Sequence, residues 1–217
     1  MRLFVVLFST LLILGCQSSD PLSAKNDPKD QWWSLDFISP SYMPGLVEHS
    51  AVEDIQGKTF QRRGGGAVGT GAPGDTTEIA KGWNKVGGNV IPVVGADLPK
   101  RIFVRWQSAV DQKTYRAWVD IPQSAREIMS ASTNSRCTET PEKPARYIAS
   151  VILGLAPGGV VQAWVRDSCH DAIKVARAQA EVEPLGPFLG KSDGKYYPQS
   201  DASKRYIEKY GIPYGSW

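Results

Sequence analysis

The stretch IFVRWQSAVDQKTYRAWVDIP, residues 102–122, decides the fold. In its first half, apolar residues occupy every second position: Ile102, Val104 and Trp106. After a polar turn at residues 111–113, the second half repeats this alternation: Tyr115, Ala117, Val119 and Ile121. Alternation with a period of two places one set of side chains on a buried face and the other on a wetter face. Two such runs joined by a short polar turn predict an antiparallel hairpin.

Shorter strands are predicted before this hairpin. Residues 32–37, WWSLDF, carry apolar side chains at alternate positions and are followed by two prolines that end the strand. Weaker strand patterns occupy residues 47–55 and 58–60, on either side of Gly57.

A second hairpin is predicted after the first. The capping box SARE at residues 124–127 predicts a short helix between them. The pattern of residues 147–155 predicts a buried strand, and that of residues 160–166 predicts its antiparallel partner. The intervening APGG at 156–159 is typical of a turn, because proline is preset for its second position and glycine accepts positive φ.

The C-terminal part is less uniform. Residues 173–182 leave helix and strand open, because their alanines favour a helix whereas Ile173, Val175 and Arg177 would also suit a strand. Residues 201–210 predict a helix that ends at Gly211. We therefore predict an α+β fold in which residues 32–217 form a single β-rich domain of antiparallel hairpins with a few short helices.

Charge and glycine patterns exclude some ligand classes. The formal net charge is +3, and removal of residues 1–15 with Arg2 leaves +2 (3 − 1), which is too weak to predict nucleic-acid binding. The glycine-rich residues 64–74 lack a following helix, and residues 186–192 are one residue short of a P-loop. We interpret both stretches as surface loops and predict neither a nucleotide nor another cofactor.

The N-terminus predicts export and lipidation. Residues 1–15 combine Arg2 with a short apolar run, as a signal peptide does, and are too short to span a bilayer as a mature helix. The following ILGC motif resembles the bacterial lipobox, which implies a lipid on Cys16 and a mature N-terminus there. Residues 16–31 then form a polar tether. Gln17, where aspartate would resemble an inner-membrane signal, implies the periplasmic side of the outer membrane. A plain secretory signal with an incidental cysteine is the alternative.

The other two cysteines are Cys137 and Cys169. In the oxidising cell envelope we expect them to form a disulfide, which would close a loop of about 30 residues and stabilise the fold by roughly 3–4 kcal/mol. Two unpaired thiols are one alternative. A zinc site with His170 and Asp171 is another, but the spacing matches no zinc finger, so we predict no metal site.

The sequence contains no recognisable catalytic constellation. His49 and His170 stand in no motif, and Ser108 lacks the G-x-S-x-G signature of a nucleophile elbow. Paired carboxylates could perform acid–base catalysis, but the sequence does not determine the distances between the three candidates: Asp36, Glu53 and Asp54. We therefore predict that the protein is not an enzyme.

The seven tryptophans divide between core and surface. Three are predicted to be core residues: Trp33, Trp106 and Trp164. Four are candidates for partial exposure: Trp32, Trp83, Trp118 and Trp217. Exposed aromatic residues beside arginines are typical of protein interfaces, although partial burial at sheet edges would explain them equally well.

Several motifs together resemble a family of bacterial lipoproteins described as a domain of unknown function. They are the lipobox, WSLDF at 33–37, WQS at 106–108, DIP at 120–122 and LAPGGV at 155–160 with Trp164. The resemblance covers most of residues 32–190. Members of that family are often encoded beside type VI secretion lipase effectors. The resemblance therefore implies an immunity protein that binds and blocks an incoming lipase, and it brings no catalytic residues.

Two other hypotheses remain open at this point. The chain could be an envelope binding or structural lipoprotein without a toxin partner, or an envelope hydrolase. Neither the partner nor its binding surface follows from the sequence.

Overall fold

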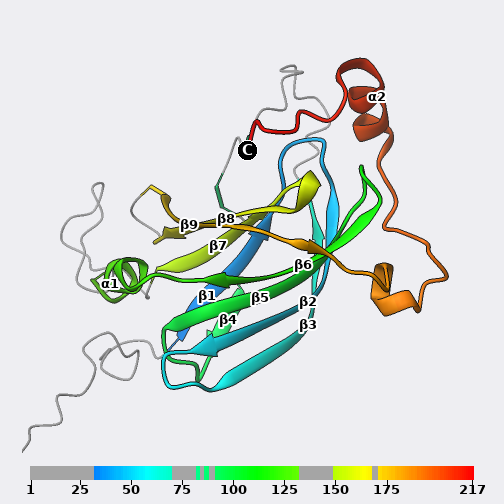
Figure 1. Cartoon of the computed structure of the whole chain (residues 1–217). Coiled ribbons are helices and arrows are strands. Elements are labelled where there is room, and N and C mark those ends of the chain that lie inside the picture. The colour runs from blue at the N-terminus through cyan, green and yellow to red at the C-terminus, as the bar shows by residue number, and fades with distance from the viewer. Residues whose placement is uncertain (1–31, 70–81, 84–85, 88–90, 132–148, 168–170) are drawn as a thin grey trace, which may run out of the picture.

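The computed structural model describes residues 32–69, 82–83, 86–87, 91–131, 149–167 and 171–217. Within these residues two five-stranded sheets pack face to face (Figure 1). The first sheet has the order β4-β1-β7-β8-β9 and contains Ile91–Val94, Trp32–Ile38, Ser150–Leu155, Val160–Arg166 and Ile173–Gln179. The second has the order β10-β6-β5-β2-β3 and contains Glu181–Val182, Lys113–Asp120, Pro99–Ser108, Gly45–Asp54 and Thr59–Val68. Helices α1 (Gln123–Ala131) and α2 (Asp201–Tyr210) lie at opposite ends of the sandwich.

The hairpin predicted for residues 102–122 is confirmed as β5 and β6. The two strands pair antiparallel from Arg101 opposite Asp120 to Ser108 opposite Lys113. Gln112 adopts a left-handed φ of 47° in the turn between them. The alternation also has the predicted sense, since one set of side chains is buried between the sheets: Ile102, Val104, Trp106, Tyr115, Ala117 and Val119.

The core between the sheets is one continuous apolar cluster. The first sheet contributes side chains from its central strands: Trp33, Leu35, Val151, Leu153, Val161 and Val165. Burial of each such side chain stabilises the fold by roughly 1.5–3 kcal/mol. The α1 helix closes one end of this core with Ala125 and Met129.

The prediction of a single β-rich domain is confirmed, whereas the α+β class is only loosely supported. The structure is a mostly antiparallel β sandwich with two short helices, and these helices form no layer of their own, so the α+β description fits loosely. The strands are not all joined as hairpins. β1 pairs parallel with β7, from Leu35 opposite Val151 to Ile38 opposite Gly154. This pairing joins segments more than 100 residues apart, which no local pattern could predict.

The prediction that the glycine-rich residues 64–74 form a surface loop was wrong for the first part of this stretch. Residues 64–66 belong to strand β3. A side chain at position 65 would place its Cβ 2.8 Å from the side chain of Val47 and 3.1 Å from Phe37. Only glycine allows β3 to approach the core this closely. Residues 70–74 lie outside the described residues.

Two local predictions are also resolved. Helix α1 begins at Gln123, so Ser124 lies within the helix and the predicted capping box was wrong. The Gln123 side chain instead donates a hydrogen bond of 3.0 Å to Glu127 one turn later. Residues 173–182, which the sequence left open between helix and strand, form β9 and β10.

The two edges of the sandwich differ. β9 pairs with β8 in the first sheet, and β10 pairs with β6 in the second, with only Ala180 between them. The chain therefore crosses from one sheet to the other and closes this edge. At the opposite edge, β3 and β4 face each other without such a crossing strand in the described part of the chain.

The outer face of the first sheet is covered as well. Trp83 packs edge-on against Trp164, with ring centroids 5.0 Å apart, and both rings lie against Gly154. Asp36, on the same face of β1 as Ile38, is only 5% exposed. Burial raises the pKa of Asp36 from 3.8 to about 6, because desolvation penalises its charged form. The backbone N–H of Phe37 donates to its carboxylate at 2.8 Å and offsets part of this effect.

We expect the variant Asp36→Asn to stabilise the protein at neutral pH by roughly 1–2 kcal/mol, a figure reduced for solvent screening. The folded state holds the Asp36 proton more tightly than the unfolded state, so ionisation destabilises the fold progressively as the pH rises from about 4 to about 6. Below that range both states are protonated, and the variant should match the wild type. Urea unfolding at pH 3 and at pH 7 measures both values.

The control is Glu53→Gln. The hydrogen bonds of Glu53 to Lys100 and Arg101 lower its pKa in the folded state, so its contribution is lost as the pH falls and has the opposite sign. An Asp36→Asn variant that is equally destabilised at both pH values would contradict the assignment.

Candidate functional site

Four of the residues that the sequence nominated for special chemistry lie outside the described part of the chain. These are Cys16, Cys137, Cys169 and His170, so the lipidation and the disulfide stay predictions. Within the described residues, no three His, Cys, Asp or Glu side chains gather as metal ligands.

The nominated catalytic residues that the structure does describe do not converge on one cleft. His49 packs against the ring of Phe103, with centroids 5.9 Å apart, whereas Ser108 is buried at the far end of β5. Glu53 pairs with Lys100 and Arg101. These groups form no nucleophile–base pair.

Asp54 has a structural role in the turn after β2. One of its carboxylate oxygens accepts hydrogen bonds of 2.9 Å from the backbone N–H groups of Gln56 and Lys58, and the other accepts one of 3.1 Å from Asp97. All three contacts hold the turn and the start of β5 together. Asp36 lies on the outer face of the other sheet, remote from this turn in the fold.

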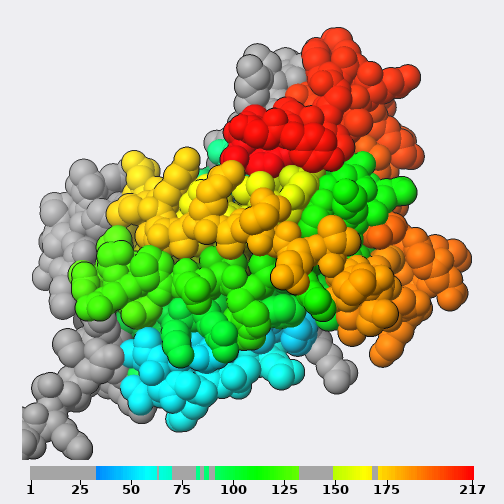
Figure 2. Space-filling view, in the orientation of Figure 1, coloured from blue at the N-terminus to red at the C-terminus, as the bar shows by residue number. Residues whose placement is uncertain are grey.

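The outer face of the second sheet combines the features of an interaction surface. We call it the aromatic–arginine face and define it by six residues: Phe103, Arg105, Arg116, Trp118, Leu185 and Leu189. These residues border a hollow of about 640 Å³. In Figure 2 the green surface of β5 and β6 lies between the cyan surface of β3 and the orange surface of the segment after β9.

Trp118 is the aromatic centre of this face. Its side chain is 42% exposed and lies opposite Phe103 in the β5–β6 ladder, with ring centroids 5.4 Å apart. The guanidinium of Arg101 lies over the indole at 4.4 Å from the ring centroid, and Glu53 accepts a 2.8 Å hydrogen bond from Arg101 Nε. The ladder, the cation–π contact and the ion pair together fix the orientation of an exposed tryptophan.

Two arginines stand directly opposite each other beside this ring. Arg105 pairs with Arg116 across β5 and β6, an arrangement of like charges that destabilises a sheet by itself. Each arginine has a carboxylate partner. Arg105 Nε lies 2.9 Å from Glu48 Oε2, and Arg116 lies 3.2 Å from Glu183 and 3.7 Å from Glu181. The charges are therefore largely compensated within the face.

Glu48 is the most constrained group of the site. A β-bulge between Val47 and His49 accommodates it as an extra residue, and its side chain is 1% exposed. Its carboxylate accepts hydrogen bonds from Arg105, from the Gln107 amide at 2.8 Å and from the backbone N–H of Phe188 at 2.7 Å. The last bond fixes the segment after β10 to the sheet.

This segment borders the hollow of the aromatic–arginine face. It continues with a short 3₁₀ helix, Pro187–Gly190, in which Phe188 and Leu189 both adopt left-handed φ values, 51° and 56°. Such conformations cost of order 1–3 kcal/mol each for residues other than glycine. The contact of Phe188 with Glu48 helps to offset this cost. As a result, three large apolar side chains are held at the surface: Leu185, Phe188 and Leu189.

The sequence located part of this site. It nominated Trp118 and Trp83 as partly exposed, which the structure confirms, whereas Trp217 is buried. The side chain of Trp32 lies outside the described part of the chain. The three predicted core tryptophans are confirmed. The sequence missed Glu48, although a carboxylate inside the otherwise apolar LVEHSAV pattern was a usable signal. It also interpreted residues 186–192 as an ordinary surface loop.

A family model described as a protein of unknown function (DUF2931) matches residues 19–215. Neither the curated proteins nor the solved structures contain a significant match.

We expect Glu48→Ala to destabilise the protein by roughly 3 kcal/mol, because it leaves the partly buried guanidinium of Arg105 and two other donors without their acceptor. The segment after β10 should also become more accessible to proteases, because it loses the hydrogen bond from Phe188. Urea unfolding and limited proteolysis measure the two effects.

Glu53→Ala is the matched control. Glu53 lies on the same strand, but its partners Lys100 and Arg101 are solvent-exposed, so its ion pairs contribute little and we expect a much smaller loss of stability than for Glu48→Ala. Equal losses in the two variants would show that Glu48 does not anchor the segment.

Proposed function

We propose that this chain, which belongs to the DUF2931 family of proteins of unknown function, is an envelope lipoprotein that neutralises a lipase effector by binding it. The lipid on Cys16 would hold it at the periplasmic side of the outer membrane. The aromatic–arginine face would contact the effector. The lipase partner is the one that the family resemblance implies, and the face is the observation that supports a binding role.

The composition of the face supports protein binding. Tryptophan and arginine supply a large share of the binding energy in protein interfaces, especially where they are held rigidly near the centre. Here Trp118 is fixed by Phe103 and Arg101, and Leu185 is 61% exposed beside it. Contact with a partner would remove these apolar side chains from water.

The charges of the face support specificity. Arg116 is about two-fifths exposed while it is paired with Glu183, so a partner carboxylate could approach it without desolvating an unpaired cation. Because Arg105 and Glu48 are already paired, they would provide a rigid floor instead of a new contact.

An anchored position suits this role. Neither described helix is long and apolar enough to cross a bilayer. Stable attachment needs two or more acyl chains, which bacterial lipoproteins carry on the N-terminal cysteine. The tether of residues 16–31 would keep the folded body typically about 20 Å from the lipid, and confinement to this layer raises the effective concentration of the inhibitor near the membrane.

The same face would serve an envelope lipoprotein with a different protein partner. The two functions differ in one observable outcome, protection of cells against a lipase. A hydrolase would need a converging set of reactive side chains, and the nominated residues within the described ranges do not form one.

We expect the mature protein to begin at Cys16 and to carry fatty acids there, because the cysteine thiol is the lipid acceptor of a lipobox. Intact-mass and peptide mass spectrometry of the membrane-extracted protein measures both features. The control variant Cys16→Ser lacks the thiol and should retain residues 1–15 without lipid. An unlipidated wild-type protein would remove the anchoring part of the proposal.

We expect Trp118→Ala to weaken binding to the proposed lipase effector by at least tenfold, because it removes the central anchor of the face. Surface plasmon resonance with the purified full chain measures the dissociation constant, and survival of cells that express the lipase in the periplasm measures protection.

Tyr210→Ala is the control, since Tyr210 is an exposed aromatic residue on α2, away from the face. Absence of binding by the wild-type chain at micromolar concentration would overturn the immunity function. Binding that Trp118→Ala leaves unchanged would overturn the assignment of the face.

A further inference from the structure

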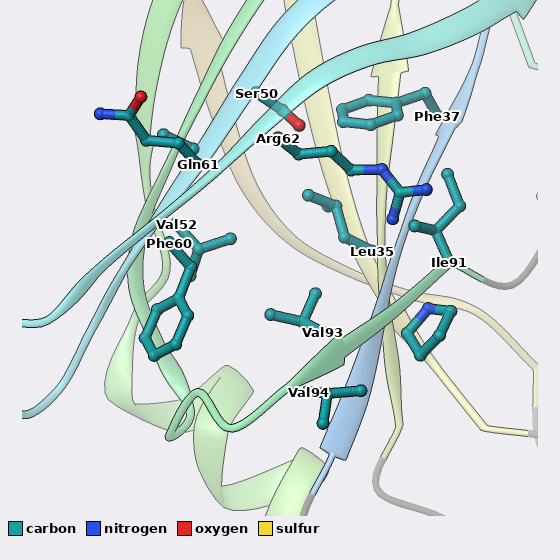
Figure 3. Close-up of a pocket in the computed structure, with 12 residues that line it drawn as sticks. Leu35, Phe37, Ser50, Val52, Phe60, Gln61, Arg62, Ile91, Val93 and Val94 are labelled. Carbon is teal, nitrogen blue, oxygen red and sulfur yellow. The ribbon is translucent and has the colours of Figure 1, made fainter.

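The open edge of the sandwich contains a cleft that the aromatic–arginine face does not use. It lies between β3 of the second sheet and β4 of the first and has a volume of about 240 Å³ (Figure 3). Its floor consists of buried core residues: Leu35, Phe37 and Val52. Phe60, Ile91 and Val93 form its partly exposed walls. The core is thus accessible from outside at this edge.

The lining contains a single charged side chain. Apart from Ser50, Gln61 and Arg62, all lining residues are apolar, and none is acidic. Arg62 is exposed and makes no ion pair within the described residues. By contrast, Arg101, Arg105 and Arg116 on the same sheet are all paired with carboxylates. An unpaired guanidinium beside an apolar cleft favours a ligand with an anionic group and a hydrocarbon part.

The polar and apolar groups are separated along the cleft. In the ladder between β2 and β3, Ser50 stands opposite Arg62, and two residues further along Val52 stands opposite Phe60. Figure 3 shows the Ser50 hydroxyl and the Arg62 side chain near Phe37, whereas Phe60 and Val93 lie toward the other end. A ligand with one charged end and one apolar end would therefore bind in a single orientation.

The edge strands disfavour a peptide as the occupant. A peptide that extended either sheet would need a row of free backbone N–H and C=O groups. Pro92 removes a donor from β4, which has only four residues. In β3, Gly64 and Gly66 have left-handed φ values of 71° and 80°, which interrupt a regular ladder. Both strands thus resist strand addition while the cleft between them stays open.

We propose that this cleft binds the hydrocarbon chain of a fatty acid, with the carboxylate held by Arg62. Guanidinium and carboxylate form a charge-assisted, commonly bidentate pair. Each methylene group that leaves water contributes about 0.8 kcal/mol. The volume is sufficient for hydrocarbon, since an apolar cavity of about 150 Å³ accommodates benzene. The proposal is independent of the aromatic–arginine face and of any protein partner.

Binding of laurate to the full chain at neutral pH, measured by isothermal titration calorimetry below the concentration at which laurate forms micelles, tests the proposal. We expect saturable binding at one site. Arg62→Gln should weaken it about tenfold, because the charged hydrogen bonds are lost. Dodecanol, which has the same chain and no charge, should bind the wild type about as weakly as laurate binds Arg62→Gln.

Two further variants locate the site. Arg205→Gln, which removes an exposed arginine from α2, should leave laurate binding unchanged. Val93→Trp fills the cleft and should abolish binding. If this variant does not fold, laurate binding to Arg62→Gln and dodecanol binding to the wild type still test the proposal, since neither measurement involves a change in the core.

Three outcomes would overturn the proposal. The first is no saturable binding of laurate to the wild type. The second is equal affinity of laurate for the wild type and Arg62→Gln. The third is equal affinity of the wild type for laurate and dodecyltrimethylammonium, because a cationic head group cannot pair with a guanidinium.

Discussion

A carboxylate that is almost fully buried must be paired, and this constraint organises one half of the molecule. Glu48 is carried by a bulge in β2, so it leaves the regular alternation of the strand. Arg105 compensates its charge. The Glu48 carboxylate also accepts hydrogen bonds from the side chain of Gln107 and from the backbone N–H of Phe188. Because the last donor belongs to the C-terminal part, pairing of one carboxylate also determines where that part lies on the sheet.

The same network extends to the rest of the C-terminal segment. The side-chain oxygen of Gln107 accepts a 2.6 Å hydrogen bond from the backbone N–H of Tyr197, so this one amide contacts both Glu48 and the chain before α2. Helix α2 then packs with Tyr206 stacked on Tyr42, at a centroid distance of 4.6 Å. Local strain at Phe188 and Leu189 persists because these contacts on both sides hold the backbone.

The two edges of the sandwich have different consequences for binding. Where β9 continues into β10, the chain covers the core and supplies Glu181 and Glu183 to Arg116. Where β3 and β4 face each other, the sheets diverge around an apolar cleft with Arg62 at one end. The arginines of the closed side are internally compensated and rigid, whereas that of the open side has no partner within the described residues. One surface therefore suits a protein partner, and the other suits a small anionic amphiphile.

The sequence by itself determined the local elements. Period-two alternation predicted β5 and β6, and Gly211 marked the end of the helix predicted at residues 201–210, because these signals depend on neighbouring residues alone. The tertiary structure decided which face binds and where the core opens. Glu48 meets Gln107 across 59 residues and Phe188 across 140, and β1 finds its parallel partner β7 across more than 100. Such contacts arise only when segments distant in the sequence are brought together by the tertiary fold, because neighbouring residues carry no signal for them.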